Sequence, residues 1–162
     1  VLHKLDAVLA DRPAPPNPAL KTTSQLLGTS AIAWYAPARW AQAARANFPY
    51  SLAQVPLLLP TEHAAVRARI NHWLGREHIR PHIAGEFEDS ALLSTFAASG
   101  MGVMPAPASL GAHLAQTCAL EWVGTTPDVH EQFHLIYSAR KVMHPLLTRL
   151  LAAAADEMLL NE

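Results

Sequence analysis

Two short polar turns carry the side chains that are best suited to bind a small ligand. One is Thr61-Glu62, after the apolar stretch 55–59, and the other is Glu88-Asp89-Ser90, after residues 82–87. Each turn places a hydroxyl and a carboxylate where a predicted strand passes into a predicted helix. Backbone N–H groups at a helix start lack partners within the helix, and small anionic or polar ligands favour such positions. The two turns are therefore the candidate binding residues.

Thr61 and Asp89 also have a purely structural interpretation as helix N-caps. Threonine and aspartate are among the preferred residues at that position, where a cap contributes about 0.5–2 kcal/mol. One residue can cap a helix and contact a ligand, so both roles stay open. The acidic residues of the second turn, Glu86, Glu88 and Asp89, argue against an anionic ligand that binds there unaided.

Nine histidines and the single cysteine, Cys118, form no recognisable catalytic or metal-binding pattern. Zinc sites and metalloproteases show spacings such as CxxC or HExxH, and neither occurs. His78 and His82 are four residues apart, but Pro81 interrupts any helix that they could share. Cys118 precedes an apolar strand, and nothing nearby would activate its thiol. We therefore predict no catalytic residue, no metal ligand, no cofactor and no enzymatic activity.

The glycines of Gly100-Met101-Gly102 have a structural explanation. This segment follows a predicted helix and enters a predicted strand, which is the reverse of the order in dinucleotide-binding loops. We predict that Gly100 ends the helix in a left-handed conformation and that the segment packs closely against its neighbours.

Composition excludes several functions. The chain has 162 residues, of which 51% are hydrophobic, so it can bury a real core. Its net charge is −1 and its pI is near 6.8, and a domain that grips nucleic acid by itself usually has a basic face. No apolar run approaches the roughly 20 residues of a membrane span, so no membrane role is expected. The first residue is Val1 rather than Met, and we interpret the chain as part of a longer protein.

The elements that would position the two turns follow from hydrophobic patterning. Strands are expected at residues 5–9, 31–36, 55–59, 82–87, 101–104, 119–123 and 132–138, and the proline-rich stretch 11–18 is expected to be a loop. Helices are expected at 37–47, after 61, after 90, at 107–116 and from 145 onward. We expect these helices to bury Val66, Ile70, Trp73, Leu74, Leu92, Leu93, Phe96, Ala97, Leu147, Leu150, Leu151, Ala154 and Met158, with Arg67, Arg69 and Arg76 off the buried face. This alternation predicts an α/β fold with a largely parallel sheet and ligands at the carboxyl ends of its strands.

The order and spacing of these pieces resemble the effector-binding domain of LysR-type transcriptional regulators. The resemblance lies in LDAVLAD (5–11), LLGTSAIAWYAP (26–37), PLLLPTEHAAVRARINHWLGREHIRP (56–81), GEFEDSALLSTFAASGMGVMPAPASL (85–110) and FHLIYSARK (133–141). Residues 56–110 look specifically like the NhaR-like branch, which activates sodium/proton antiporter genes. The ordered set carries the resemblance, since no single motif is diagnostic.

The resemblance implies a two-lobed fold similar to type II periplasmic binding proteins. Residues 29–137 would form a complete lobe II, and residues 1–28 and 138–162 would supply part of lobe I. The N-terminal DNA-binding domain and the first part of lobe I are expected to be absent. DNA would then be bound only through the missing domain, and the full-length protein would be a cytoplasmic dimer or tetramer.

The resemblance also implies where an effector binds. Thr61, Glu62, Glu88, Asp89 and Ser90 would lie at the cleft edge of lobe II, and Asp11 and Arg12 on the lobe I side. The effector would be a small molecule or ion, with sodium or lithium as the cations to which the NhaR-like branch responds. Hard cations need oxygen ligands, which Glu62, Glu86, Glu88 and Asp89 could supply.

Two other classes of function stay open. A free-standing solute-binding lobe of a transport system is the alternative to the sensing and oligomerisation domain of a transcription activator. An α/β hydrolase is disfavoured, because the sequence has no nucleophile elbow.

Overall fold

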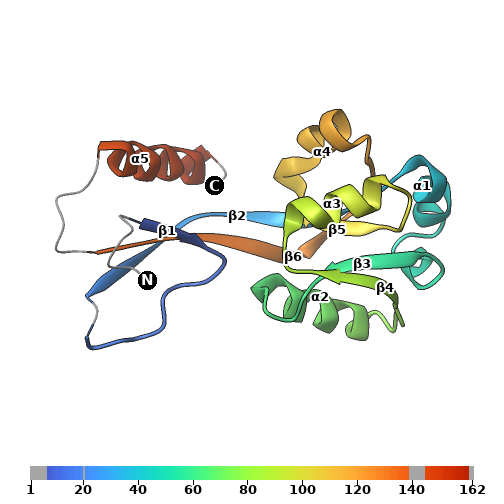
Figure 1. The fold of residues 1–162 in the computed structure, drawn as a ribbon, viewed down its shortest axis with the longest axis horizontal. Helices are drawn as coiled ribbons and strands as arrows, with labels where there is room; N and C mark the ends of the chain where they lie inside the picture. Colours follow the sequence, from blue (N-terminus) through green and yellow to red (C-terminus); the bar gives the residue numbers. More distant parts are fainter. Residues whose placement is uncertain (1–6, 20, 139–144, 161–162) are drawn as a thin grey trace. The chain divides into compact units, whose positions relative to one another are not determined.

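In the computed structural model, residues 7–19, 21–138 and 145–160 are described. The strands are β1 (Ala7–Ala10), β2 (Thr22–Ala36), β3 (Pro56–Pro60), β4 (His82–Phe87), β5 (Met104–Pro107) and β6 (Glu121–Ser138). The α-helices are α1 (Ala38–Arg45), α2 (Ala65–Arg76), α3 (Ser90–Ala98), α4 (Gly111–Cys118) and α5 (Pro145–Leu160), and two short 3-10 helices span Tyr50–Ala53 and Ala108–Leu110. Figure 1 shows these elements along the chain. The predicted α/β class is confirmed.

The chain divides into two compact units, which we describe separately. Unit 1 comprises Val1–Thr29 with Gln132–Glu162, and unit 2 is Ser30–Glu131. In unit 1, β1 pairs with the end of β6 in antiparallel register, with Ala7 opposite Tyr137. The predicted strand at 5–9 is thus observed from Ala7, its first two residues lying outside the described part of the chain. Leu9 was predicted to be buried and is 64% exposed.

The strands of unit 2 belong to two sheets, one with antiparallel and one with parallel pairing, which corrects the prediction of a largely parallel sheet. Strands β3 and β4 are parallel, whereas β2 and β5 are antiparallel, with Ile32 opposite Pro107. A parallel bridge from Leu57 to Val103 joins the β3–β4 pair to the start of β5. Hydrophobic alternation identifies strands but does not encode which edge each strand pairs with, so the direction of pairing was not predictable from it.

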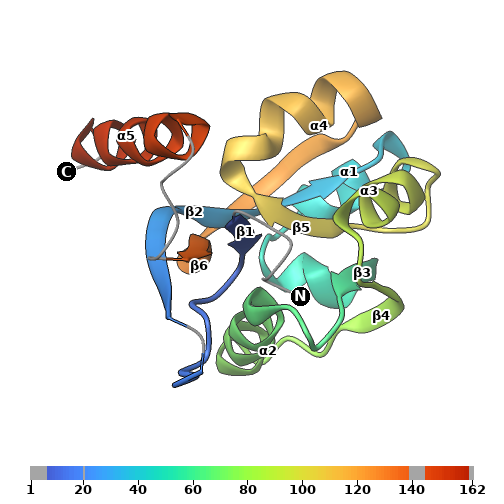
Figure 2. The same cartoon turned by 60° about the vertical axis from the view of Figure 1, so that its left-hand side comes forward.

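Helices cover both faces of the β3–β4 sheet, as the apolar β3 sequence predicted. Leu57 and Leu59 join one buried cluster with Ile70 and Trp73 of α2. Leu58 points to the other face and joins a second cluster that includes residues of α3, α4 and the end of β2. The ribbon shows α2 on one side of the β3–β4 pair and α3 on the other, with α3 and α4 on the same side (Figures 1 and 2).

The segment from β4 through α3 to β5 follows the prediction closely. Asp89 is the N-cap of α3, and Gly100 follows the helix with a left-handed φ of 101°. Gly102 passes so close to β3 that a Cβ there would lie 2.6 Å from the Pro56 carbonyl oxygen. The predicted helix stop and close packing are therefore confirmed. Strand β5 begins at Met104 rather than residue 101, and Met101 is exposed.

Other expectations need correction. Helix α2 begins at Ala65 with Ala64 as its N-cap residue and no side-chain cap, so the capping role predicted for Thr61 is wrong. The separate strands predicted at 119–123 and 132–138 are parts of one long strand, β6. Besides Leu9, the predicted core residues Leu92, Phe96 and Leu150 are exposed. Leu92 and Phe96, which belong to α3, face solvent because this helix buries only the stripe formed by Leu93, Ser94 and Ala97.

Candidate ligand-binding site

The structure brings the two predicted turns together. Strands β3 and β4 run parallel with Pro60 opposite Phe87, so both end at the same edge of the sheet. The backbone N–H of Thr61 donates to the Phe87 carbonyl oxygen at 3.1 Å, which ties the start of one turn to the start of the other. We call Thr61-Glu62 and Glu88-Asp89-Ser90 at this position the turn edge. Its members come from segments about 27 residues apart, and parallel pairing accounts for their meeting.

Asp89 is fixed by its capping role. Its Oδ1 accepts hydrogen bonds from the backbone N–H groups of Ala91 and Leu92, at 2.7 and 3.2 Å. The second oxygen, Oδ2, has no partner among the described residues. The side chain of Asp89 is exposed. Asp89 therefore caps α3 with one oxygen and presents the other to a ligand.

The remaining turn residues leave their polar groups open. Glu62, Glu88 and Ser90 are exposed, and Thr61 is half-buried. With Asp89 they give the turn edge three carboxylates, a surface that favours cations or neutral polar groups over anions. Across the part of the chain that the structure describes, no three histidine, cysteine or acidic side chains converge to hold a metal ion. A cation at the turn edge would therefore need backbone carbonyls or water among its ligands.

A buried arginine, Arg67, forms hydrogen bonds with the ends of the two strands that lead into the turn edge. The Arg67 side chain is only 5% exposed, and its Nη1 donates at 2.7 Å both to the Pro60 carbonyl oxygen and to Glu86 Oε2. Its Nε donates to Asn71 Oδ1 at 2.9 Å, one turn along α2. Arg67 thus links the end of β3, the end of β4 and helix α2. We refer to these contacts as the Arg67 brace.

The brace corrects one expectation from the sequence and adds a contact to another predicted residue. Arg67 was predicted to lie off the buried face of α2, and it is buried. Glu86, a predicted contributor to cation binding, has one oxygen engaged by Arg67. The helical pattern alone does not distinguish Arg67 from Arg69. The difference is the position of Glu86 on β4, which only the strand register reveals.

Asp11 and Arg12 belong to unit 1, in the loop that follows β1. Arg12 Nε donates to Asp11 Oδ1 at 2.9 Å, which forms an exposed ion pair between neighbours. This hydrogen bond, together with the attraction of the Asp11 charge, raises the pKa of Arg12. Their predicted role in effector binding stays a prediction.

Comparisons with known proteins identify relatives among transcription regulators. Residues 2–159 match the family model of the LysR substrate binding domain. The chain is 24% identical over 148 residues to the transcriptional activator protein NhaR of Escherichia coli (strain K12), a match that covers 91% of this chain and 48% of that protein. It is 30% identical over 113 residues to the nitrogen assimilation regulatory protein nac of the same organism, over 68% of this chain and 35% of that one. The chain thus spans about half or less of the length of these relatives.

A solved structure supports the same fold. The AmpR effector binding domain from Citrobacter freundii superposes with a TM-score of 0.71 at 17% sequence identity, covering 95% of this chain and 76% of that one. This likeness confirms the predicted periplasmic-binding-protein-like effector-domain fold. Among the described residues, no helix is both long and apolar enough to cross a membrane.

Proposed function

Because the chain belongs to the LysR substrate-binding domain family, we propose that it senses a small effector for a transcription activator and has no catalytic role of its own. The family match across residues 2–159 is the observation that carries this proposal. Both curated relatives described above are named as regulators, so the comparisons do not favour the alternative of a transport protein's solute-binding lobe. We further propose that the complete regulator is a cytoplasmic homo-oligomer that contacts DNA through a different domain.

The division into two units supports an assignment to lobes. We assign residues 29–137 to lobe II and residues 1–28 with 138–162 to lobe I. Unit 2, Ser30–Glu131, lies within this lobe II, starting one residue later and ending six residues earlier. An effector that binds one conformation more tightly than another shifts the population between them, and this shift would change how the regulator acts on its promoter.

The turn edge is the proposed effector site on unit 2, and Asp11 and Arg12 are proposed effector-binding residues of unit 1. Two observations support it. The turns meet at the carboxyl ends of a parallel strand pair, where ligands bind in α/β folds. The Asp89 Oδ2 and the side chains of Glu62 and Glu88 are exposed there. Their charge favours a small cation, and we propose sodium or lithium, with an antiporter gene as the regulated target.

Thermal unfolding with added salts tests the proposal. A ligand that binds only the folded chain raises the unfolding midpoint as its concentration rises. We expect lithium and sodium chloride to raise the midpoint more than potassium chloride at equal ionic strength. A parallel series of small carboxylic acids and neutral polar compounds tests other effectors. If sodium and lithium act no differently from potassium, the cation proposal fails, while the sensing role stands if another compound gives a saturable shift.

Asp89 offers a variant that separates capping from binding. Asparagine caps helices about as well as aspartate, so Asp89→Asn should leave stability nearly unchanged while it removes the charge. Asp89→Ala should lower stability by about 0.5–2 kcal/mol through loss of the cap. We expect both variants to lose the ligand-induced shift, with Glu77→Gln as a control that removes a carboxylate elsewhere on unit 2. An undiminished shift in Asp89→Asn would show that this carboxylate does not bind the effector.

A further inference from the structure

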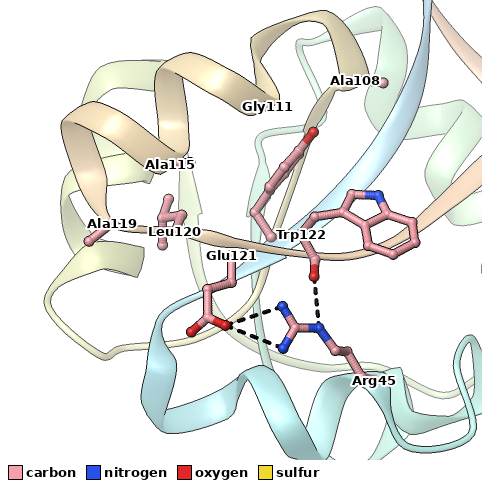
Figure 3. A pocket seen from close by; sticks show the side chains of 9 residues that line it. Arg45, Ala108, Gly111, Ala115, Ala119, Leu120, Glu121 and Trp122 are labelled. Atoms are coloured by element: carbon pink, nitrogen blue, oxygen red, sulfur yellow. Dashed lines mark hydrogen bonds and ion pairs between the residues drawn. The ribbon is translucent and has the colours of Figure 1, made fainter.

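Unit 2 contains a hollow with a volume of about 650 Å³ that the sequence did not indicate. Its apolar wall is formed by the α4 helix and the residues around it, and Arg45, Glu121 and Trp122 form its polar rim (Figure 3). This volume is within the range of small-molecule sites in proteins. Tyr35, which also lines it, pairs with Met104 at the amino end of β5. None of the residues that line the hollow belongs to the turn edge.

The Tyr35 hydroxyl is the feature that most needs an explanation. The residue is only 2% exposed, and its ring belongs to the cluster that contains Leu58 and Leu93. Its hydroxyl has no hydrogen-bond partner among the described residues, although buried polar groups nearly always have one. No described side-chain nitrogen or oxygen is both fully enclosed and unpartnered. The Tyr35 oxygen must therefore open into the hollow that it lines.

Gly111 keeps this oxygen accessible. A Cβ at Gly111 would lie 2.8 Å from the Tyr35 hydroxyl oxygen, which would block it. Its backbone, with φ −55° and ψ −46°, is ordinary right-handed helix that any residue can adopt. The absence of a side chain at Gly111 therefore keeps the Tyr35 hydroxyl accessible and is not required by the backbone conformation.

The rim is electrically balanced and carries a fixed aromatic ring. Arg45 donates from Nη1 and Nη2 to Glu121 Oε1 at 3.3 and 3.2 Å and from Nε to the Trp122 carbonyl oxygen at 2.9 Å. The Trp122 side chain is 55% exposed, and its indole N–H donates to Thr125 Oγ1 at 3.1 Å. The two rim charges compensate each other, so the hollow has no excess charge with which to select an ion.

We propose that this hollow is a second binding site, for a small uncharged molecule with a planar apolar ring and one hydrogen-bond acceptor. The acceptor takes the proton of the Tyr35 hydroxyl, and the ring rests on the apolar wall beside the Trp122 indole. Burial raises the pKa of Tyr35, so its hydroxyl is a donor throughout the neutral range. The site is separate from the turn edge, and its failure would leave the proposed effector site untouched.

Fluorine NMR of the chain labelled with 5-fluorotryptophan tests the proposal, with benzamide as the probe. The chain has four tryptophans, and Trp122→Phe assigns the signal of interest. We expect benzamide to shift the Trp122 resonance saturably and to leave those of the buried Trp34 and Trp73 unchanged. Toluene, which has the ring without the acceptor, should bind more weakly.

Two variants tie the binding to the named groups. Tyr35→Phe removes only an unpartnered hydroxyl, so it should fold normally and weaken benzamide binding about threefold to tenfold. Gly111→Ala should weaken binding more than tenfold, and Gly75→Ala, a glycine in α2 with nothing within 4 Å of its Cβ position, is its matched control. The proposal is overturned if benzamide leaves the Trp122 signal unshifted, or if both site variants bind as well as the native chain.

Discussion

Replacing Arg67 by methionine is the most informative perturbation of the turn edge, because methionine fills a similar apolar volume without any donor. The change removes three hydrogen bonds, to the Pro60 carbonyl, Glu86 and Asn71. A hydrogen bond that involves a charged group contributes about 1.5–3 kcal/mol, and we assign this range to the bond from Arg67 to the Pro60 carbonyl oxygen. The Glu86 carboxylate is 46% exposed, so solvent screens its ion pair and leaves at most about 1 kcal/mol. The hydrogen bond from Arg67 to the exposed Asn71 adds little to the free energy of unfolding.

The expected loss for Arg67→Met is therefore about 2–4 kcal/mol, a large part of the 5–15 kcal/mol that stabilises a typical domain. Glu86→Gln keeps an acceptor for Arg67 and should cost about 1 kcal/mol. Arg69→Met is the matched control, since Arg69 is less buried and donates only to the His130 carbonyl oxygen. We expect it to cost less than about 1 kcal/mol.

Urea unfolding monitored by tryptophan fluorescence is the appropriate assay, since all four tryptophans lie in unit 2. A shift of the midpoint without a change of slope gives the loss in stability directly. If Arg67→Met is within 1 kcal/mol of the native chain, or no worse than Arg69→Met, the brace contributes nothing net. A loss in Glu86→Gln as large as in Arg67→Met would instead show that the ion pair dominates.

Two further predictions concern unit 2. Gly102→Ala should destabilise the chain by about 1–3 kcal/mol, because the added Cβ would push Val103 away from the Pro56 carbonyl oxygen, to which the Val103 N–H donates at 2.9 Å. Thermal unfolding measures this loss, with Gly75→Ala as the control. Equal unfolding midpoints for the two variants would refute the close approach of Gly102 to Pro56. Burial raises the pKa of Tyr35 above its unfolded value near 10. As the pH rises, Tyr35 therefore loses its proton in the unfolded chain before it does so in the folded chain. The free energy of unfolding is unaffected by this residue below about pH 10 and falls above it. Native stability should therefore fall relative to Tyr35→Phe above pH 10, by at most about 1.4 kcal/mol per pH unit in urea titrations, and a gap that stays constant to pH 11 would contradict the shift.

The sequence predicted correctly those features that depend only on residues close together in the chain, such as helix caps, helix ends and strands of continuous apolar residues. The Asp89 cap and the Gly100 helix stop depend on a few neighbouring residues, and both appear where they were expected. The β3 strand was recognisable because its apolar residues are continuous. Thr61 illustrates the limit, because a hydroxyl after a strand looks like a cap whether the helix starts at the next residue or, as here, at Ala65.

The rest depended on contacts between distant segments. Arg67 is buried because Glu86 and the Pro60 carbonyl, which belong to two different strands, meet above it. The adjacency of the two turns depends on the parallel register of β3 and β4, which no local pattern encodes. Tyr35 looked like an ordinary strand residue, and its open hydroxyl became apparent only once Gly111 was placed beside it.

The alternation of buried leucines along β3 gives unit 2 two separable interiors. Leu57 and Leu59 belong with α2 and hence with the Arg67 brace, whereas Leu58 belongs with α3, α4 and Tyr35. Substitutions that do not share partners tend to act independently. Evolution could therefore remodel the layer that supports the turn edge without disturbing the hollow beside α4, and the reverse. Because β3 separates the two buried clusters, one domain could gain or lose each of two ligand specificities independently of the other.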